Sequence, residues 1–372
     1  MAYVAVKGGQ EAIKEAEKLL HYYRIKGGSL PLEIQQIKDQ FRLAVDKVMG
    51  EGSLYDPDLA ALALKQAEGD SIEASFMMRA FRSTLPRNHH SILVDTENMQ
   101  VIRRISATFK NIPGGQFLGP TTDYSKRMLQ FDLTEESEAD IQAFLAECLP
   151  DTDLVNQTEI PTFPRVIEML RHQGLVENRK INNAHTIQKE DITRRSIQLP
   201  ETRPVRLQSM ARGETGAMMA LAYSTARGYG SVHPTLGELR VGYVPVYIPH
   251  PIFEQEKIYI GKVMLTEIEV IAKLRAGRKE TEKKEEAKYT IGYGLCFGQN
   301  ELKAMSMATL DRAMEVDEPS APAEDEEFVL YHIDGIEASG FVSHWKLPHY
   351  VTFQAGLSRL RSIQERRADD DE

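Results

Sequence analysis

The segment ELRVGYVPVYIP, residues 238–249, alternates apolar and polar side chains over most of its length. A period of two predicts a β-strand. Further on, KIYIGKVMLTEIEVI (257–271) predicts either a strand pair or a strand followed by a helix. The segment YTIGYGLCFGQNELKAMSMATLDRAM (289–314) predicts a strand, a glycine turn and a helix. We therefore expect the second half of the chain to mix strands and helices.

The first part of the chain has a helical period instead. In residues 31–49 the apolar side chains recur at close to helical spacing, which predicts one helix. Asp56 followed by Pro57 is typical of an N-cap with proline in the first helical position. Asp70 is a second N-cap candidate. Residues 10–85 are therefore expected to form helical hairpins.

Together these patterns predict an α+β fold, in which a helical N-terminal domain is followed by a mixed α/β C-terminal domain. The expected boundaries are 1–133 for the helical domain, 134–205 for a variable connector, and 206–372 for the mixed domain. The mixed domain would carry a histidine pair described below. The sequence shows no regular βαβ series and no internal repeat.

Composition limits the function classes. The 372 residues include 45 Lys and Arg against 55 Asp and Glu, a net charge of −10, which argues against a protein that coats nucleic acid. The two cysteines, Cys148 and Cys296, form neither a disulfide framework nor a CxxC motif, so a reducing compartment is expected. The N-terminus does not resemble a signal peptide, and no segment approaches the roughly 20 apolar residues of a membrane span. The chain is therefore predicted to be cytoplasmic, without a membrane or nucleic-acid partner.

The stretch FVSHWKLPHYVTF, residues 341–353, holds two histidines five residues apart. A straight helix or a straight strand would separate His344 from His349. Pro348 makes a continuous helix unfavourable, so a bend could bring both imidazoles to one metal ion. Two ligands are too few for zinc or a similar ion, so others would come from a distant residue, a partner or substrate. The alternative is a pair of structural or surface histidines.

Two glycine-rich stretches are candidates for phosphate contact. In GYGLCFG, the glycines Gly292 and Gly294 would let backbone N–H groups approach a phosphate, although the Lys-Ser/Thr of a P-loop is absent. Close packing of strand on helix explains these glycines equally well. In STARGYG, Arg227 could clamp phosphate or phosphonate oxygens with its guanidinium, or could lie solvated in a surface turn.

The motif LTEIEV places Glu267 and Glu269 on one face of a strand. Departure of a base from ribose builds oxocarbenium charge, which a carboxylate stabilises, and an acid protonates the leaving base. Solvated side chains are the alternative for this pair.

Several strings follow one another along the chain: YVAVKGG, RRISA, IPGGQ, ALAYSTARGYG, GYGL, DEEFVL and GFVSHWKLPHYV. As an ordered set they resemble the I subunits of the bacterial carbon–phosphorus lyase core complex, the PhnI family. The likeness covers most of the chain. The segments around 134–200 and 272–288 and the acidic tail look variable.

The resemblance implies a subunit of a cytoplasmic enzyme of phosphonate catabolism. With its partners, methylphosphonate displaces adenine from ATP and gives α-D-ribose 1-methylphosphonate 5-triphosphate. Alone, such a subunit acts as a purine nucleosidase on ATP or GTP, with water as the nucleophile. The implied partners are the G, H and J subunits in a two-fold hetero-oligomer, with the K and L ATPase-like subunits as further candidates. The iron–sulfur cluster belongs to the radical J subunit and is not expected in this chain.

The resemblance also associates the H-x-x-x-x-H motif with a metal site where the I and J subunits meet. His344 and His349 are then ligands of a divalent metal, with zinc as the first candidate. For phosphate or phosphonate oxygens we assign Arg227, Lys346, Gly292 and Gly294, and for the ribosyl chemistry Glu267 and Glu269. The alternative function is a non-catalytic scaffold that completes an interface metal site for the J subunit.

Overall fold

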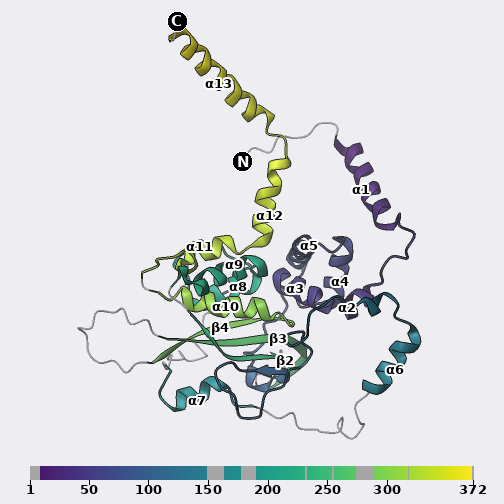
Figure 1. The fold of residues 1–372 in the computed structure, drawn as a ribbon, viewed down its shortest axis with the longest axis vertical. Helices are drawn as coiled ribbons and strands as arrows, with labels where there is room; N and C mark the ends of the chain where they lie inside the picture. The colour runs from purple at the N-terminus through teal and green to yellow at the C-terminus, as the bar shows by residue number, and fades with distance from the viewer. Residues whose placement is uncertain are drawn as a thin grey trace, which may run out of the picture. The chain divides into compact units, whose positions relative to one another are not determined.

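The structure is a computed structural model that describes residues 9–148, 163–176, 190–230, 233–253, 255–273, 288–316 and 318–370. It has an α+β fold, as predicted (Figure 1). The chain divides into two compact units. The first comprises residues 1–84, 212–217 and 330–372, and the second comprises residues 85–211 and 218–329.

The first unit is helical. Four short helices, α2 to α5, surround a core that includes Val48, Met49, Ala60 and Met78. The helices near the N-terminus are α1 (Gly9–Ile25), α2 (Ile34–Gln40), α3 (Arg42–Gly52), α4 (Pro57–Gln66) and α5 (Ser71–Thr84). Near the C-terminus the same unit has α12 (Gly335–Ser343), a short 3-10 turn η7 (His344–Lys346) and α13 (Tyr350–Asp370).

The predicted caps are confirmed. The Asp56 carboxylate accepts hydrogen bonds from the first-turn backbone of α4, and Asp70 does the same for α5. The single helix predicted for residues 31–49 is wrong, because Phe41 leaves helical geometry with φ −110° and ψ 35°. The break lets Ile37 and Val45 reach the same core cluster.

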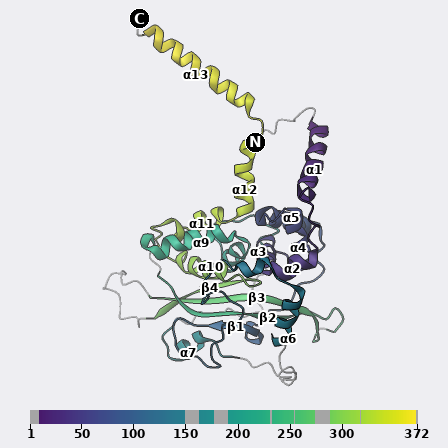
Figure 2. The ribbon, with the colours of Figure 1, turned by 45° about the vertical axis from the view of Figure 1, so that its right-hand side comes forward.

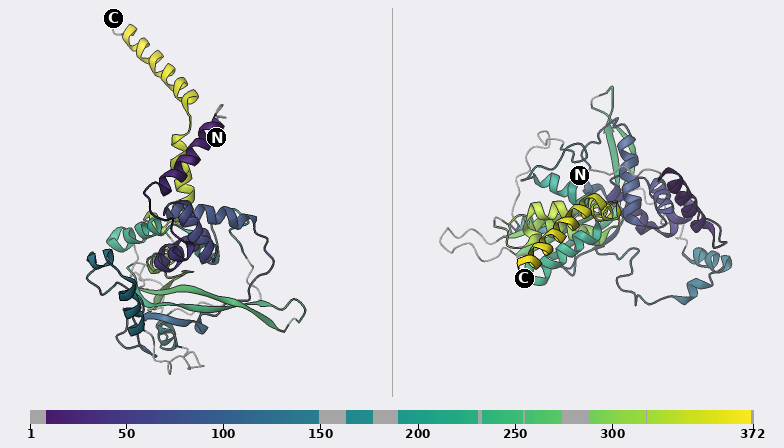
Figure 3. Two further views of the ribbon diagram at one scale, coloured as in Figure 1. Left: turned by 90° about the vertical axis from the view of Figure 1, so that its right-hand side faces the viewer. Right: turned by 90° about the horizontal axis from the view of Figure 1, so that it is seen from above.

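The second unit contains a four-stranded antiparallel sheet of order β1-β2-β3-β4. The strands are β1 (Gln100–Ile105), β2 (Thr235–Pro249), β3 (Lys257–Lys273) and β4 (Tyr289–Phe297). Figure 3 shows β2 and β3 running together as one long hairpin. The strand pair or strand–helix unit expected at 257–271 is therefore wrong. Gly261 lies at a bulge inside one continuous strand, with φ +136°.

Helices cover both faces of this sheet (Figures 1 and 2). The helix α10 (Glu301–Ala313) packs on one face, and α7 (Val166–His172) lies at the other. The longer helices completing the described chain are α6 (Glu138–Cys148), α8 (Arg203–Arg212), α9 (Thr215–Ser224) and α11 (Glu326–His332), and a π-helical turn, η5 (Thr225–Tyr229), follows α9. Within the described residues, no helix is both long and apolar enough to cross a membrane.

Two glycines allow α10 to approach the sheet closely. A Cβ atom on Gly292 would overlap the carbonyl oxygen of Ala308, and one on Gly294 would overlap that of Ala304. The glycine turn predicted across residues 292–298 is therefore misplaced: the strand continues to Phe297, and the turn falls at Gly298, with φ +70°. Close strand–helix packing, one of the two explanations considered, accounts for both strand glycines.

The compact units differ from the predicted domains. Strand β1 falls inside the predicted helical domain of residues 1–133, yet it pairs with β2 in the second unit. The C-terminal residues 330–372, with both histidines, belong to the same unit as the N-terminal helices. The spacing of apolar residues predicted local structure well. It did not reveal which distant segments of the chain belong to the same compact unit.

We expect Gly294→Ala to destabilise the fold by about 1–3 kcal/mol, because its methyl group would overlap the backbone of α10. Urea denaturation followed by circular dichroism measures this. The matched control is Gly356→Ala in α13, where a Cβ meets nothing within 4 Å and alanine favours the helix. Equal free energies of unfolding for the two variants would contradict the packing explanation.

Candidate functional site

The two histidines of the C-terminal segment lie close together. His344 begins η7, and Leu347 is extended (φ −75°, ψ 154°) ahead of Pro348, so the predicted break is present. The centres of the His344 and His349 rings are 5.5 Å apart, with an angle of 63° between the ring planes. The His349 residue is exposed, and His344 is half-buried. The bend therefore brings together two imidazoles that a straight helix or strand would separate.

Their hydrogen bonds suit metal ligation. The Nδ1 atom of His349 is 2.6 Å from the carbonyl oxygen of Leu347, and Nδ1 of His344 contacts that of Phe341. Because a carbonyl only accepts, each Nδ1 carries the proton and each Nε2 keeps a lone pair for a metal. Two imidazoles on one tetrahedral zinc ion would have ring centres roughly 5 Å apart, close to the spacing found. The part of the chain that the structure describes contains no group of three His, Cys, Asp or Glu side chains able to hold a metal.

The predicted phosphate ligands come from three different elements, η7, η5 and β4. Lys346 is exposed on η7, between the two histidines in sequence. Arg227 is exposed in η5, next to Gly228 with φ +112°, and it belongs to the second unit. Gly292 and Gly294 lie within β4 and face α10 rather than preceding a helix. Of these four residues, Lys346 belongs to the first unit and the other three to the second.

The carboxylate pair is buried rather than solvated. Glu267 and Glu269 lie on β3, on the face opposite α10, and expose 2% and 6% of their surface. Across the hairpin, Arg240 pairs with Glu267 and Glu238 pairs with Glu269. Four charged side chains from two strands therefore share one covered face of the sheet.

Glu267 is held as a carboxylate. It accepts hydrogen bonds from Thr96 Oγ1 at 2.7 Å and Tyr293 Oη at 2.8 Å, and it forms an ion pair with Arg240. Burial alone would raise the pKa of Glu267, but the charges of Arg240 and Arg165 outweigh burial and lower that pKa below its ordinary value. Glu267 thus stays ionised.

Glu269 has the opposite character. Burial, reinforced by the negative charge of Glu267, raises the pKa of Glu269 to about 7. Its nearest cation is Arg165, whose Nη1 lies 3.7 Å from Oε1, too far for a hydrogen bond. Two carboxyl groups on one strand face therefore differ in protonation near neutral pH.

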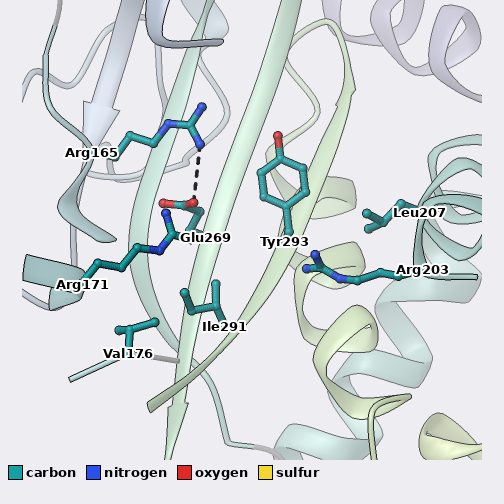
Figure 4. A pocket seen from close by; sticks show the side chains of 8 residues that line it. All are labelled: Arg165, Arg171, Val176, Arg203, Leu207, Glu269, Ile291 and Tyr293. Atoms are coloured by element: carbon teal, nitrogen blue, oxygen red, sulfur yellow. Dashed lines mark ion pairs between the residues drawn. The ribbon is translucent and has the colours of Figure 1, made fainter. Parts of the chain in front are cut away.

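A cavity of about 280 Å³ opens beside this pair (Figure 4). Its polar wall consists of Glu269, Tyr293 and three arginines, and its apolar wall consists of Val176, Leu207 and Ile291. Burial and the neighbouring carboxylate raise the pKa of Tyr293, so its hydroxyl stays protonated. Glu267 does not line the cavity.

Most of this wall was not predicted from the sequence. Arg165 and Arg171 lie in the predicted variable connector, and Arg203 lies at the start of α8. One sequence pattern could have indicated these buried charges. The strand that begins with ELR places Glu238 and Arg240 on one face of the sheet. Charges alternating within a strand covered on both sides predict a buried polar network.

The raised pKa of Glu269 makes stability depend on pH. Between its ordinary pKa of 4.5 and about 7, the folded chain holds a proton that the unfolded chain has lost. The contribution of this group to the free energy of unfolding therefore falls as pH rises through that window and stays constant above it. We expect Glu269→Gln to abolish this fall, as measured by urea denaturation at about pH 5 and about pH 8. An unchanged pH dependence in the variant would contradict the assignment.

Comparison with known proteins identifies the family. The family described as "Bacterial phosphonate metabolism protein (PhnI)" matches residues 2–367. The chain is 48% identical to the putative C-P lyase subunit protein HtxH of Stutzerimonas stutzeri, over 98% of this chain and 97% of that protein. It is 45% identical to the alpha-D-ribose 1-methylphosphonate 5-triphosphate synthase subunits PhnI of Rhizobium meliloti, over 97% and 95%, and of Escherichia coli, over 98% of both chains. The chain belongs to the PhnI family of bacterial phosphonate metabolism proteins.

Proposed function

We propose that the chain is the ribosyl-transferring subunit of a carbon–phosphorus lyase complex. In this reaction methylphosphonate displaces adenine from ATP, and alone the chain releases purine from ATP or GTP with water as the nucleophile. The observation that carries the proposal is the pair of neighbouring carboxyl groups with opposite protonation. Environments that push two carboxyl pKa values apart are typical of an acid and a stabilising anion in one active site.

In the proposed reaction Glu269 is the general acid. Its carboxyl group lines the cavity and has a pKa of about 7, so it is matched to proton donation near neutral pH. It would give its proton to the departing base as the bond from ribose to nitrogen breaks. The oxocarbenium charge that develops on the ribose is then stabilised by nearby negative charge.

Glu267 is assigned a positioning role within this scheme. It is covered by hydrogen bonds from Thr96 and Tyr293 and does not reach the cavity. Its fixed charge raises the pKa of Glu269 and attracts the Arg165 guanidinium, whose Nη2 lies 3.5 Å away. Glu267 therefore acts on the reaction through Glu269 and Arg165, and not by touching the substrate.

The substrate class follows from the relatives. Two of them are named as subunits of a synthase of alpha-D-ribose 1-methylphosphonate 5-triphosphate. The name contains both the ribose triphosphate and the phosphonate of the proposed reaction. The G, H and J subunits are the expected partners, with the K and L subunits as further candidates.

We expect Glu269→Gln to lower purine release from ATP or GTP by about 100-fold or more, because the amide has no acidic proton to donate. The assay is chromatography of free base after incubation with the purified chain, alone and with its partner subunits plus methylphosphonate. The matched control is Glu256→Gln, the same change at an exposed position between β2 and β3. Absence of base release by the unmodified chain in both assays would refute the enzyme proposal.

A second candidate function rests on the histidine pair. Two neighbouring imidazoles with available Nε2 atoms would complete a metal site whose other ligands come from a partner or substrate. When bound, a divalent ion such as zinc would polarise a phosphate or phosphonate oxygen. In this scaffold function, the chain itself performs no bond cleavage.

We expect His344→Ala and His349→Ala each to remove the divalent metal from the purified complex, as measured by elemental analysis. Loss of one of the two histidine ligands weakens metal binding. Even removal of a residue that only hydrogen-bonds to a metal ligand lowers metal affinity by about 10- to 100-fold. The exposed His90 provides the control, His90→Ala, which should retain the metal. Retention of metal by both His344 and His349 variants would exclude these residues as ligands.

A further inference from the structure

We propose that the cavity beside Glu269 binds a small phosphonate or phosphate oxyanion through Arg165, Arg171 and Arg203. We commit to an organic phosphonate with a short apolar substituent as the ligand. That choice rests on the proposed function, whereas the oxyanion class follows from the cavity itself. The three guanidinium groups come from the segment before α7, from α7 and from α8.

Each arginine retains donors that no described residue uses. Arg203 commits Nε and Nη2 to Asp311 at 2.9 and 2.6 Å, which fixes its plane and leaves Nη1 available. Arg171 contacts Glu168 through Nη1 and leaves Nη2 available. Planar guanidinium groups with available N–H bonds match the geometry of phosphonate oxygens.

Arg165 is held in place and keeps a donor for a ligand. Its Nη2 contacts the Thr96 hydroxyl, which fixes the guanidinium. Its Nη1 lies 3.7 Å from Oε1 of Glu269, too far for a hydrogen bond, so this donor remains available beside the cavity.

The charges in the wall favour an anion. Three guanidinium groups face one carboxyl group, that of Glu269 (Figure 4). Of the carboxylates that pair with these arginines, Glu269 lines the cavity, whereas Asp311 and Glu168 do not.

Size and polarity narrow the ligand further. The cavity measures about 280 Å³, below the 300–1,000 Å³ typical of pockets for drug-sized ligands. Its walls therefore suit a small oxyanion, and a nucleoside triphosphate would place only its reacting end there, beside Glu269. Its apolar side, formed by Val176, Leu207 and Ile291, offers contact to a methyl or short alkyl group.

Isothermal titration of the full chain with methylphosphonate, inorganic phosphate and sulfate tests the site. We expect saturable one-to-one binding of methylphosphonate, weakened about tenfold or more in Arg171→Gln by the loss of a charge-assisted hydrogen bond. Arg171 pairs with Glu168 on a half-exposed helix face, so this variant should fold. The control is Arg194→Gln, which removes an exposed guanidinium that pairs with Asp191 outside the cavity, so this variant should bind as the unmodified chain does.

Arg203→Lys is the second variant. It keeps a cation beside Asp311 but removes the planar fork, so it should also weaken binding. Absence of saturable binding by the unmodified chain would overturn the site. The site would also be overturned if Arg171→Gln and Arg203→Lys both bound methylphosphonate with the affinity of the unmodified chain. Tighter binding of inorganic phosphate than of methylphosphonate would overturn the phosphonate assignment. Purine release with water needs no phosphonate, so persistence of that activity without phosphonate binding would refute this inference alone.

Discussion

The burial of charge on one face of the sheet constrains the second unit more than any other interaction. Arg240 of β2 lies opposite Glu267 of β3, and both expose 2% of their surface. Breaking such a buried pair by removing one partner costs about 3–5 kcal/mol, because an unpaired charge remains in a medium of low polarity. The pairing register of the hairpin and the position of α7 must therefore satisfy these groups together.

The other charges on this face follow from that requirement. Arg104 of β1 donates from Nε to Glu238 Oε1 at 2.6 Å, and the backbone N–H of Val166 donates to the other oxygen at 3.0 Å. Glu238 thus anchors the start of α7, directly after Arg165. The arginine that reaches Glu267 and Glu269 is positioned by a helix that a third glutamate caps. Glu269, left without a hydrogen-bonding cation, is the group whose pKa rises.

Local sequence patterns predicted the parts of the fold that depend on neighbouring residues. The caps at Asp56 and Asp70, the strand at 238–249 and the break at Pro348 all depend on side chains within a few positions. The placement of β1 beside β2, and of the C-terminal helices with the N-terminal ones, depends on contacts between distant segments. The spacing of apolar residues along the sequence carries no information about such contacts, so the predicted domain boundaries did not match the compact units.

The candidate sites show the same division. The histidine pair was predictable because the bend lies between its two members. Glu267 and Glu269 could be placed on one face, but their opposite protonation could not be foreseen. It depends on Arg240, Arg165 and Thr96, which are distant from Glu267 in the sequence. Arg240 is 27 residues away and Thr96 is 171 residues away.

The two candidate sites differ in how complete they are. The cavity beside Glu269 has an acid, hydrogen-bond donors and an apolar wall within one compact unit. The histidine pair offers two ring nitrogens, and no third His, Cys, Asp or Glu side chain joins them among the residues described. A metal that needs at least three protein ligands would therefore draw the rest from outside this set. A chain with one self-contained site and one incomplete site fits a subunit whose chemistry is partly its own and partly shared, as expected of a protein whose relatives are named as subunits.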